Sequence, residues 1–195
     1  MKVKICGITN LEDAVMCEEL GADAIGFVHY PGRRRSLPLK TIAEMIGSIG
    51  PMTQKVLVCD PSGLKEATEL LDESRADLLQ VYSLSAEDLQ GFRDFGGKII
   101  RAVKPDVDEV RKFVNYADAL LFEAGEPGTG AAYDYSLVPT EHCRKSIIAG
   151  GLNIGNIDLV KAKKPYALDV SSGVESSVGK KDPRLVAEFI RKCKE

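Results

Sequence analysis

The stretch that decides the fold is residues 3–29, VKICGITNLEDAVMCEELGADAIGFVH, which contains one strand–helix–strand repeat. Residues 3–6 and 24–29 are short apolar runs, as expected of strands in a buried sheet. Between them, Asn10 is a candidate N-cap for a helix over residues 14–20, and Gly21 supplies a C-terminal stop. This segment predicts two strands joined by a helix.

The same repeat continues along the chain. Further apolar runs, nearly continuous rather than alternating, lie at residues 55–59, 78–82, 98–103, 119–122, 146–149 and 167–171. Helical segments are expected at residues 38–49, 62–73, from 85 onward, 107–115, 135–142, 154–162 and 184–192, of which 135–142 has the weakest pattern. Continuous apolar strands are typical of parallel strands covered on their outer face.

Eight strand–helix repeats predict an α/β fold, the parallel (β/α)₈ TIM barrel, as a single domain over residues 1–195. A doubly wound open sheet is the structural alternative. It would need fewer strands, and no G-x-G-x-x-G motif follows the first strand.

Composition argues against several classes of protein. A net charge of −3 is unlike the basic surface that general nucleic-acid binding needs. No apolar run approaches the roughly 20 residues of a membrane span, and the chain begins on a strand rather than a signal peptide. The five cysteines form no C-x-x-C pair, so neither a disulfide framework nor a metal site is expected. These features predict a cytoplasmic protein.

Three strand ends carry the candidate functional residues. Cys6 ends the first apolar run, Gly150 and Gly151 follow the seventh, and Ser171-Ser172-Gly173 follow the eighth. In a (β/α)₈ barrel these ends share one face, and phosphate commonly binds after strands seven and eight. The thiol could move a proton and the loop amides could hold a phosphate. Tight turns that need glycine at positive φ are a second, compatible explanation for the glycines.

Several motifs in order extend this picture. They are KICGIT at 4–9, GADAIGFVHYPGRRR at 21–35, IRAVKP at 100–105, GTG at 128–130, IIAGGLN at 147–153, DVSSGVE at 169–175 and GKKD at 179–182. On these motifs the chain resembles the phosphoribosylanthranilate isomerases of tryptophan biosynthesis. The resemblance implies a single-domain barrel that needs no cofactor, takes a small phosphorylated substrate, and occurs as a monomer or homodimer. It also implies acid–base catalysis of an Amadori rearrangement.

The resemblance assigns roles to individual residues. Cys6 matches the general base, and Arg35 matches an arginine that faces the anthranilate ring, whose carboxylate a guanidinium can bind through two hydrogen bonds. Arg33 and Arg34 are expected to lie in solvent. Asp169 is expected near the amine or hydroxyls of the substrate, with a structural acceptor for backbone amides as the alternative.

The general acid is where this chain departs from the family. The family ends the sixth strand with Leu-Leu-Asp, and here the segment reads Leu120-Leu121-Phe122-Glu123. An ungapped alignment of the strand puts Phe122 in the place of the acid, and strand alternation would send Glu123 to the opposite face. A bulge or an early strand end would restore it. Glu123 is the expected acid and Glu126 the alternative, although both also fit solvated loop charge.

Two further departures concern strands four and two. Tyr82 stands where the family has histidine, and it can donate a hydrogen bond but cannot titrate near neutrality. His29 stands where the family has an apolar aromatic, and it could tune the thiol or cap the pocket rim. It is left out of the catalytic set because a lone histidine is more often structural.

Two other functions remain alternatives. One is a different sugar-phosphate isomerase or synthase on a phosphate-binding barrel. The other is a non-catalytic phosphate-binding relative. Retention of Cys6 and Arg35 argues against it, because a protein that only binds phosphate does not need the thiol.

Overall fold

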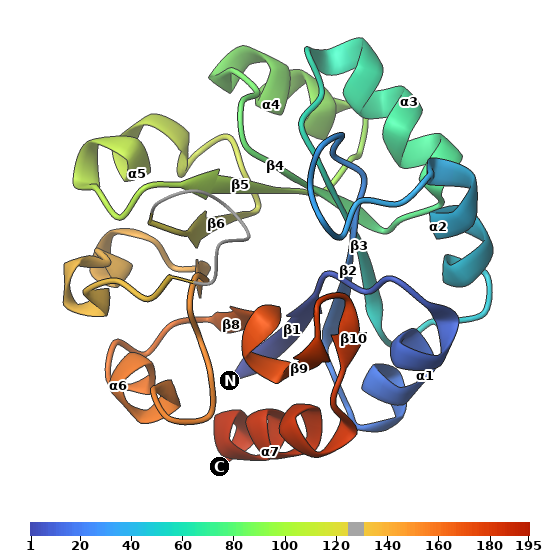
Figure 1. Cartoon of the computed structure of the whole chain (residues 1–195). Coiled ribbons are helices and arrows are strands. Elements are labelled where there is room, and N and C mark those ends of the chain that lie inside the picture. The colour runs from blue at the N-terminus through green and yellow to red at the C-terminus, as the bar shows by residue number, and fades with distance from the viewer. Residues whose placement is uncertain (125–130) are drawn as a thin grey trace.

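The computed structural model describes residues 1–124 and 131–195, and their strands close into a parallel barrel in chain order (Figure 1). The strands are β1 (Lys2–Cys6), β2 (Ala24–Val28), β3 (Gln54–Cys59), β4 (Leu78–Val81), β5 (Ile99–Val103), β6 (Ala119–Phe122), β7 (Ser146–Ile148) and β8 (Ala167–Val170). Pairing of β1 with β8, which sets Lys4 opposite Asp169, closes the ring. The predicted barrel is confirmed and the open sheet is excluded.

Helices form a ring outside the strands (Figure 1). They are α1 (Leu11–Glu19), α2 (Leu39–Ile46), α3 (Leu64–Ser74), α4 (Ala86–Asp94), α5 (Val107–Phe113), α6 (Ile157–Lys161) and α7 (Pro183–Lys194). Local signals explain several boundaries. The Asn10 side chain accepts from the Asp13 amide at the start of α1, Gly21 follows α1 at φ +88°, and Asp182 caps α7 with Pro183 at its first position.

The helix expected over residues 135–142 is replaced by two 3₁₀ turns, η1 (Tyr135–Leu137) and η2 (Thr140–His142). Pro139 lies between them, has no N–H to continue a helix, and disfavours helical geometry at Val138, whose ψ is 118°. The sequence also did not predict η3 (Ser172–Val174) or the hairpin of β9 (Glu175–Ser177) and β10 (Lys180–Lys181).

Side chains alternate between two packed layers. One fills the barrel interior and includes Ala119, Leu121 and Ile147, and the other lies between strands and helices and includes Leu120 and Phe122. This alternation decides which residues at the strand ends enter the barrel mouth. Within the described ranges, no helix combines the length and apolar character that crossing a membrane requires.

Candidate active site

A pocket of about 460 Å³ opens at the carboxyl ends of the strands. Its lining comes from segments throughout the chain. From the predicted site it includes Cys6, Arg35, Glu123, Gly150, Gly151, Asp169, Ser171 and Ser172. The structure therefore brings these residues together, whereas Gly173, the next residue after Ser172, is not part of the lining.

Cys6 lies beside a buried ion pair. Lys4, two residues earlier on the inner side of β1, places its Nζ 2.9 and 3.0 Å from the two carboxylate oxygens of Asp169. Burial raises the pKa of the Cys6 thiol and outweighs the opposing effect of the Lys4 ammonium. Room for the sulfur comes from Gly26 on β2, because a Cβ there would lie 2.9 Å from Sγ. The thiol is thus held in the pocket mainly in its protonated form.

Lys4 was not identified from the sequence, although a lysine inside an apolar strand indicates a buried charge that needs a partner. Burial alone would lower its pKa, but the Asp169 carboxylate and the Cys6 sulfur raise it overall. Burial likewise raises the pKa of Asp169 against the pull of the Lys4 ammonium. Asp169 lines the pocket, and its two carboxylate oxygens accept hydrogen bonds from the Lys4 ammonium.

Glu123 enters the pocket by normal strand alternation. Leu121 lies in the barrel interior, Phe122 is fully buried in the outer layer, and the Glu123 amide continues the ladder by donating to the Val103 carbonyl at 3.2 Å. The expectation that Phe122 takes the place of the acid is therefore wrong, as is the expectation that alternation turns Glu123 away. No bulge is needed, since the inward series is Ala119, Leu121, Glu123. Glu126 lies outside the described residues.

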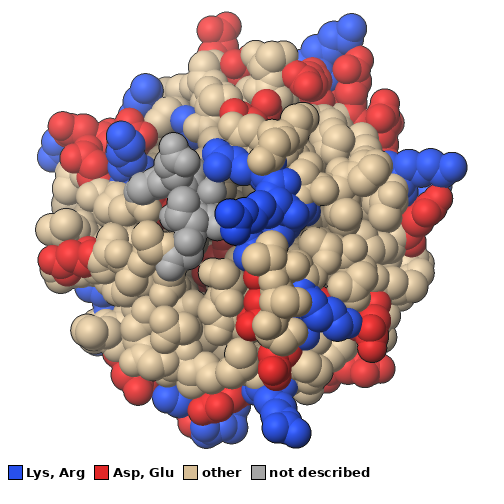
Figure 2. All heavy atoms as spheres, viewed as in Figure 1, with Lys and Arg blue, Asp and Glu red and all other residues tan. Residues whose placement is uncertain are grey.

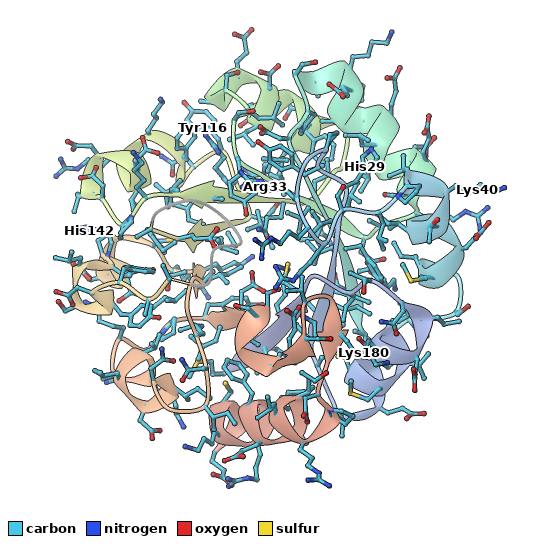
Figure 3. The ribbon with its side chains drawn as sticks, in the orientation of Figure 1. His29, Arg33, Lys40, Tyr116, His142 and Lys180 are labelled. Carbon is cyan, nitrogen blue, oxygen red and sulfur yellow. The ribbon has the colours of Figure 1, made fainter. Side chains whose placement is uncertain are left out.

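Tyr82, which directly follows β4, contacts Glu123, and Gln80 on β4 contacts Tyr82. The Tyr82 hydroxyl lies 3.4 Å from Glu123 Oε2 and accepts from Gln80 Nε2, also at 3.4 Å. Burial and the neighbouring Glu123 raise the pKa of Tyr82, so it stays protonated and donates. His29 is not in the pocket lining, and its Nδ1 lies 2.9 Å from the Leu37 carbonyl (Figure 3). His29 therefore contacts the backbone at Leu37 rather than the pocket.

Arg35 reaches across the mouth directly above Gly7. Gly7 has φ +73°, and a Cβ there would collide with Arg35 Cδ, so only glycine admits this path. The guanidinium donates from Nε and Nη2 to the Glu175 carboxylate at 2.8 and 2.6 Å. Lys181 donates to the same carboxylate at 2.8 Å. Glu175 and Lys181 fall in the quoted motifs, but no role was predicted for either of them.

Arg33 also lies at the pocket, contrary to the expectation that it faces solvent. It lines the pocket and its guanidinium lies 5.0 Å from the centre of the Tyr30 ring. The Tyr30 hydroxyl in turn donates to Asp60 at 3.1 Å. Arg34 is exposed but contributes to the rim. Figure 2 shows basic side chains gathered over the barrel mouth, and Figure 3 shows Arg33 directed toward its centre.

The two predicted phosphate loops meet in the wall of the pocket. Gly150 and Gly151 have φ values of +85° and +66°, which permit the sharp turn after β7. A Cβ on Gly173 would overlap the carbonyl oxygen of Leu152, so glycine lets the loop after β8 approach the loop after β7. Within residues 1–124 and 131–195, the amides of Gly151, Ser172 and Gly173 donate to no backbone acceptor.

This arrangement suits proton transfer on a small anion. A thiol and a carboxyl group from the ends of β1 and β6 line one pocket, together with arginines and the loops after β7 and β8. In the described part of the chain, no group of three or more His, Cys, Asp or Glu side chains is placed to bind a metal ion.

Comparison with known proteins identifies similar sequences. The family model described as N-(5'-phosphoribosyl)anthranilate (PRA) isomerase matches residues 3–192. The N-(5'-phosphoribosyl)anthranilate isomerase of Pseudomonas aeruginosa (strain LESB58) is 39% identical over 97% of this chain and 93% of the relative. The enzyme of the same name from Azotobacter vinelandii is 36% identical over 100% and 98%.

Solved structures agree. The phosphoribosyl anthranilate isomerase of Thermus thermophilus superposes with a TM-score of 0.89 at 33% identity, covering 100% of this chain and 99% of that one. A phosphoribosyl anthranilate isomerase in complex with reduced 1-(o-carboxyphenylamino)-1-deoxyribulose 5-phosphate gives 0.86 at 30% identity, covering 100% and 98%.

Proposed function

Because the chain belongs to the N-(5'-phosphoribosyl)anthranilate isomerase family of tryptophan biosynthesis, we propose that the pocket at its barrel mouth is the active site, with Cys6 as general base and Glu123 as general acid. The enzyme is an isomerase that converts N-(5-phosphoribosyl)anthranilate to 1-(2-carboxyphenylamino)-1-deoxyribulose 5-phosphate. The observation that carries the assignment of roles is that the Cys6 thiol and the Glu123 carboxyl line the same pocket.

The reaction needs two proton transfers on one substrate. An acid protonates the furanose ring oxygen while the C1–O bond breaks and an iminium forms. A base then removes the proton from C2, which gives an enolamine that tautomerises to the ketone. Both groups must reach the bound sugar, and general acid–base catalysis of this kind requires hydrogen-bond reach of the atoms involved. Glu123 at the end of β6 and Cys6 at the end of β1 are the two groups assigned to these steps.

The remaining lining residues are assigned to substrate binding. Arg35 pairs with the anthranilate carboxylate, and Asp169 lies near the amine or hydroxyls of the substrate. The loops at Gly150-Gly151 and Ser171-Ser172-Gly173 hold the phosphate through backbone amides. The ligand in the related crystal structure carries both a carboxyphenylamino group and a phosphate, which supports a site with two anion-binding ends.

The wider setting follows from the same features. Residues 1–195 form a single domain that acts as a monomer or homodimer on a small phosphorylated substrate, with no nucleic-acid partner. The five cysteines are all free in the structure, which fits a reducing cytoplasm.

The direct test is turnover of N-(5-phosphoribosyl)anthranilate, followed by loss of anthranilate fluorescence, in wild type and Cys6→Ser. Loss of the base should reduce kcat by roughly 100-fold or more while the reduced product analogue still binds. Cys193→Ser on α7 is the matched control and should keep wild-type turnover. Near-normal turnover by Cys6→Ser would remove the thiol from the mechanism. A wild-type protein that binds the analogue without turnover would instead favour a non-catalytic relative.

A further inference from the structure

A buried chain of three charges connects the barrel mouth to the β9–β10 hairpin. Glu175 accepts two hydrogen bonds from Arg35 and one from Lys181, and the side chains of Arg35, Glu175 and Lys181 are 10%, 5% and 0% exposed. The two partners compete with the cost of burying Glu175 and lower its pKa. Glu175 is therefore held as a carboxylate between two cations.

Lys181 makes a second contact, with the loop that follows β8. Its Nζ donates to the Ser171 carbonyl at 3.2 Å, at the start of the loop proposed to hold the phosphate. The backbone of Lys181 is fixed as well, because its amide donates to Asp13 at 2.8 Å and the residue pairs with Glu175 across the hairpin. The Lys181 ammonium thus contacts both Glu175, which binds Arg35, and the proposed phosphate loop.

The Arg35 guanidinium is oriented by this contact. Glu175 occupies Nε and Nη2, which leaves Nη1 without an acceptor in the described part of the chain. The stem of Arg35 lies over Gly7, so the side chain is held at two points along its length. A guanidinium fixed in this way presents one defined edge to an incoming carboxylate, with little freedom left to lose on binding.

We propose that Glu175 and Lys181 are positioning residues that hold the carboxylate-binding arginine and the phosphate loop at a fixed separation. The inference rests on the proposed function, since that function puts an anion at each end of the substrate. Glu175 acts on the arginine alone. Lys181 acts on both ends, through Glu175 and through the Ser171 carbonyl. Replacing Glu175 should therefore weaken binding at the carboxylate end only, whereas replacing Lys181 should weaken binding at both ends.

The experiment compares Glu175→Gln and Lys181→Met in the full-length enzyme. It measures kcat, KM, the Kd of reduced 1-(o-carboxyphenylamino)-1-deoxyribulose 5-phosphate and the inhibition constant of inorganic phosphate. Glu175→Gln should raise KM and the analogue Kd about tenfold, change kcat less than about threefold, and leave phosphate inhibition unchanged. Lys181→Met should weaken both the analogue and inorganic phosphate about tenfold.

Lys180→Met is the matched control. Lys180 precedes Lys181 in β10 but does not line the pocket (Figure 3). Its ammonium group pairs with Glu12 and Asp13 instead. This variant should keep wild-type values in every measurement. If Lys181→Met does not fold, Glu175→Gln combined with Lys181→Met removes both buried charges together and should show both binding defects.

Three results would overturn the proposal. Unchanged or tighter analogue binding by Glu175→Gln would show that Glu175 does not orient Arg35 or that it competes with the substrate. If Glu175→Gln weakened phosphate inhibition as much as Lys181→Met does, Glu175 would not act on the arginine alone. Normal phosphate inhibition in Lys181→Met would show that the Ser171 contact has no effect. Each of these results is measured relative to a wild-type enzyme that turns over the substrate. Failure of the proposed function would instead appear as no turnover by the wild type.

Discussion

Phe122 and Glu123 are neighbours in the chain, yet their side chains lie on opposite sides of the barrel wall. Phe122 is fully buried between strands and helices, and Glu123 lines the pocket. The register of β6 against β5, which pairs Phe122 with Val103, fixes this outcome. The candidate acid therefore reaches the barrel mouth with a regular strand and no insertion.

The first prediction separates the two candidate acids. Glu123→Gln should lower kcat roughly 100-fold or more, because a positioned acid contributes about that much and the amide cannot donate its proton in the same way. Glu126→Gln should keep wild-type turnover. The measurement is the fluorescence assay with N-(5-phosphoribosyl)anthranilate. The reverse pattern would transfer the role to Glu126, and full activity in both variants would require a different donor.

The second prediction concerns the protonation of Cys6. Burial raises the pKa of this thiol, so the thiolate should form only as the pH rises above the ordinary thiol value of about 8.5. The Lys4 ammonium favours the thiolate, so Lys4→Met should move the titration midpoint to still higher pH. Ultraviolet absorbance of the thiolate would measure both midpoints.

Cys6→Ser is the control for this titration, because its absorbance change comes only from the other ionisable groups. Burial raises the pKa of Cys17 and Cys59 to about 12 and that of Cys193 to about 11, so these thiols titrate late. A midpoint in Lys4→Met below that of wild type would contradict the assigned role of the ammonium.

The third prediction tests the contact between the two phosphate loops. Gly173→Ala should push the loop after β8 away from the Leu152 carbonyl and weaken inhibition by inorganic phosphate about tenfold or more. Gly47→Ala is the control, because Gly47 has φ −61° and a Cβ there meets only ordinary contacts. Unchanged phosphate inhibition in Gly173→Ala would show that the close approach of the loops is not needed for binding.

The fourth prediction concerns stability in acid. Burial opposes ionisation of Asp13, but hydrogen bonds from the Lys181 amide, Lys180 and Asn10 outweigh it and lower its pKa. A carboxyl whose folded pKa is depressed stabilises the protein above its unfolded value, about 3.9, and this stabilisation is lost as the pH falls through the folded value.

Asp13→Asn should therefore lose less stability than wild type between neutral and strongly acidic pH. Urea unfolding midpoints across that range provide the measurement. Asp72→Asn removes an exposed carboxylate on α3 and should follow the wild-type curve. A curve for Asp13→Asn that parallels wild type would show that Asp13 does not contribute to the pH dependence.

Much of the architecture was predictable from local patterns. The strand predicted at residues 119–122 is β6 itself, and the capping residues Asn10 and Asp182 begin α1 and α7 as expected. These features depend on hydrophobic runs and on side chains that bond to nearby amides. The prediction of a helix over residues 135–142 was wrong. The apolar spacing there is helical, but Pro139 lacks the N–H that a continuous helix needs.

The sequence by itself determined the barrel and the strand ends that meet at its mouth, because parallel strands place their carboxyl ends on one face. Only the tertiary structure decided that Glu123 and not Phe122 faces inward, since a shift of one residue in register reverses every side chain of a strand. It alone revealed the Lys4–Asp169 pair and the Arg35–Glu175–Lys181 chain. Those contacts join segments far apart in the sequence, and their geometry exists only once the barrel has closed.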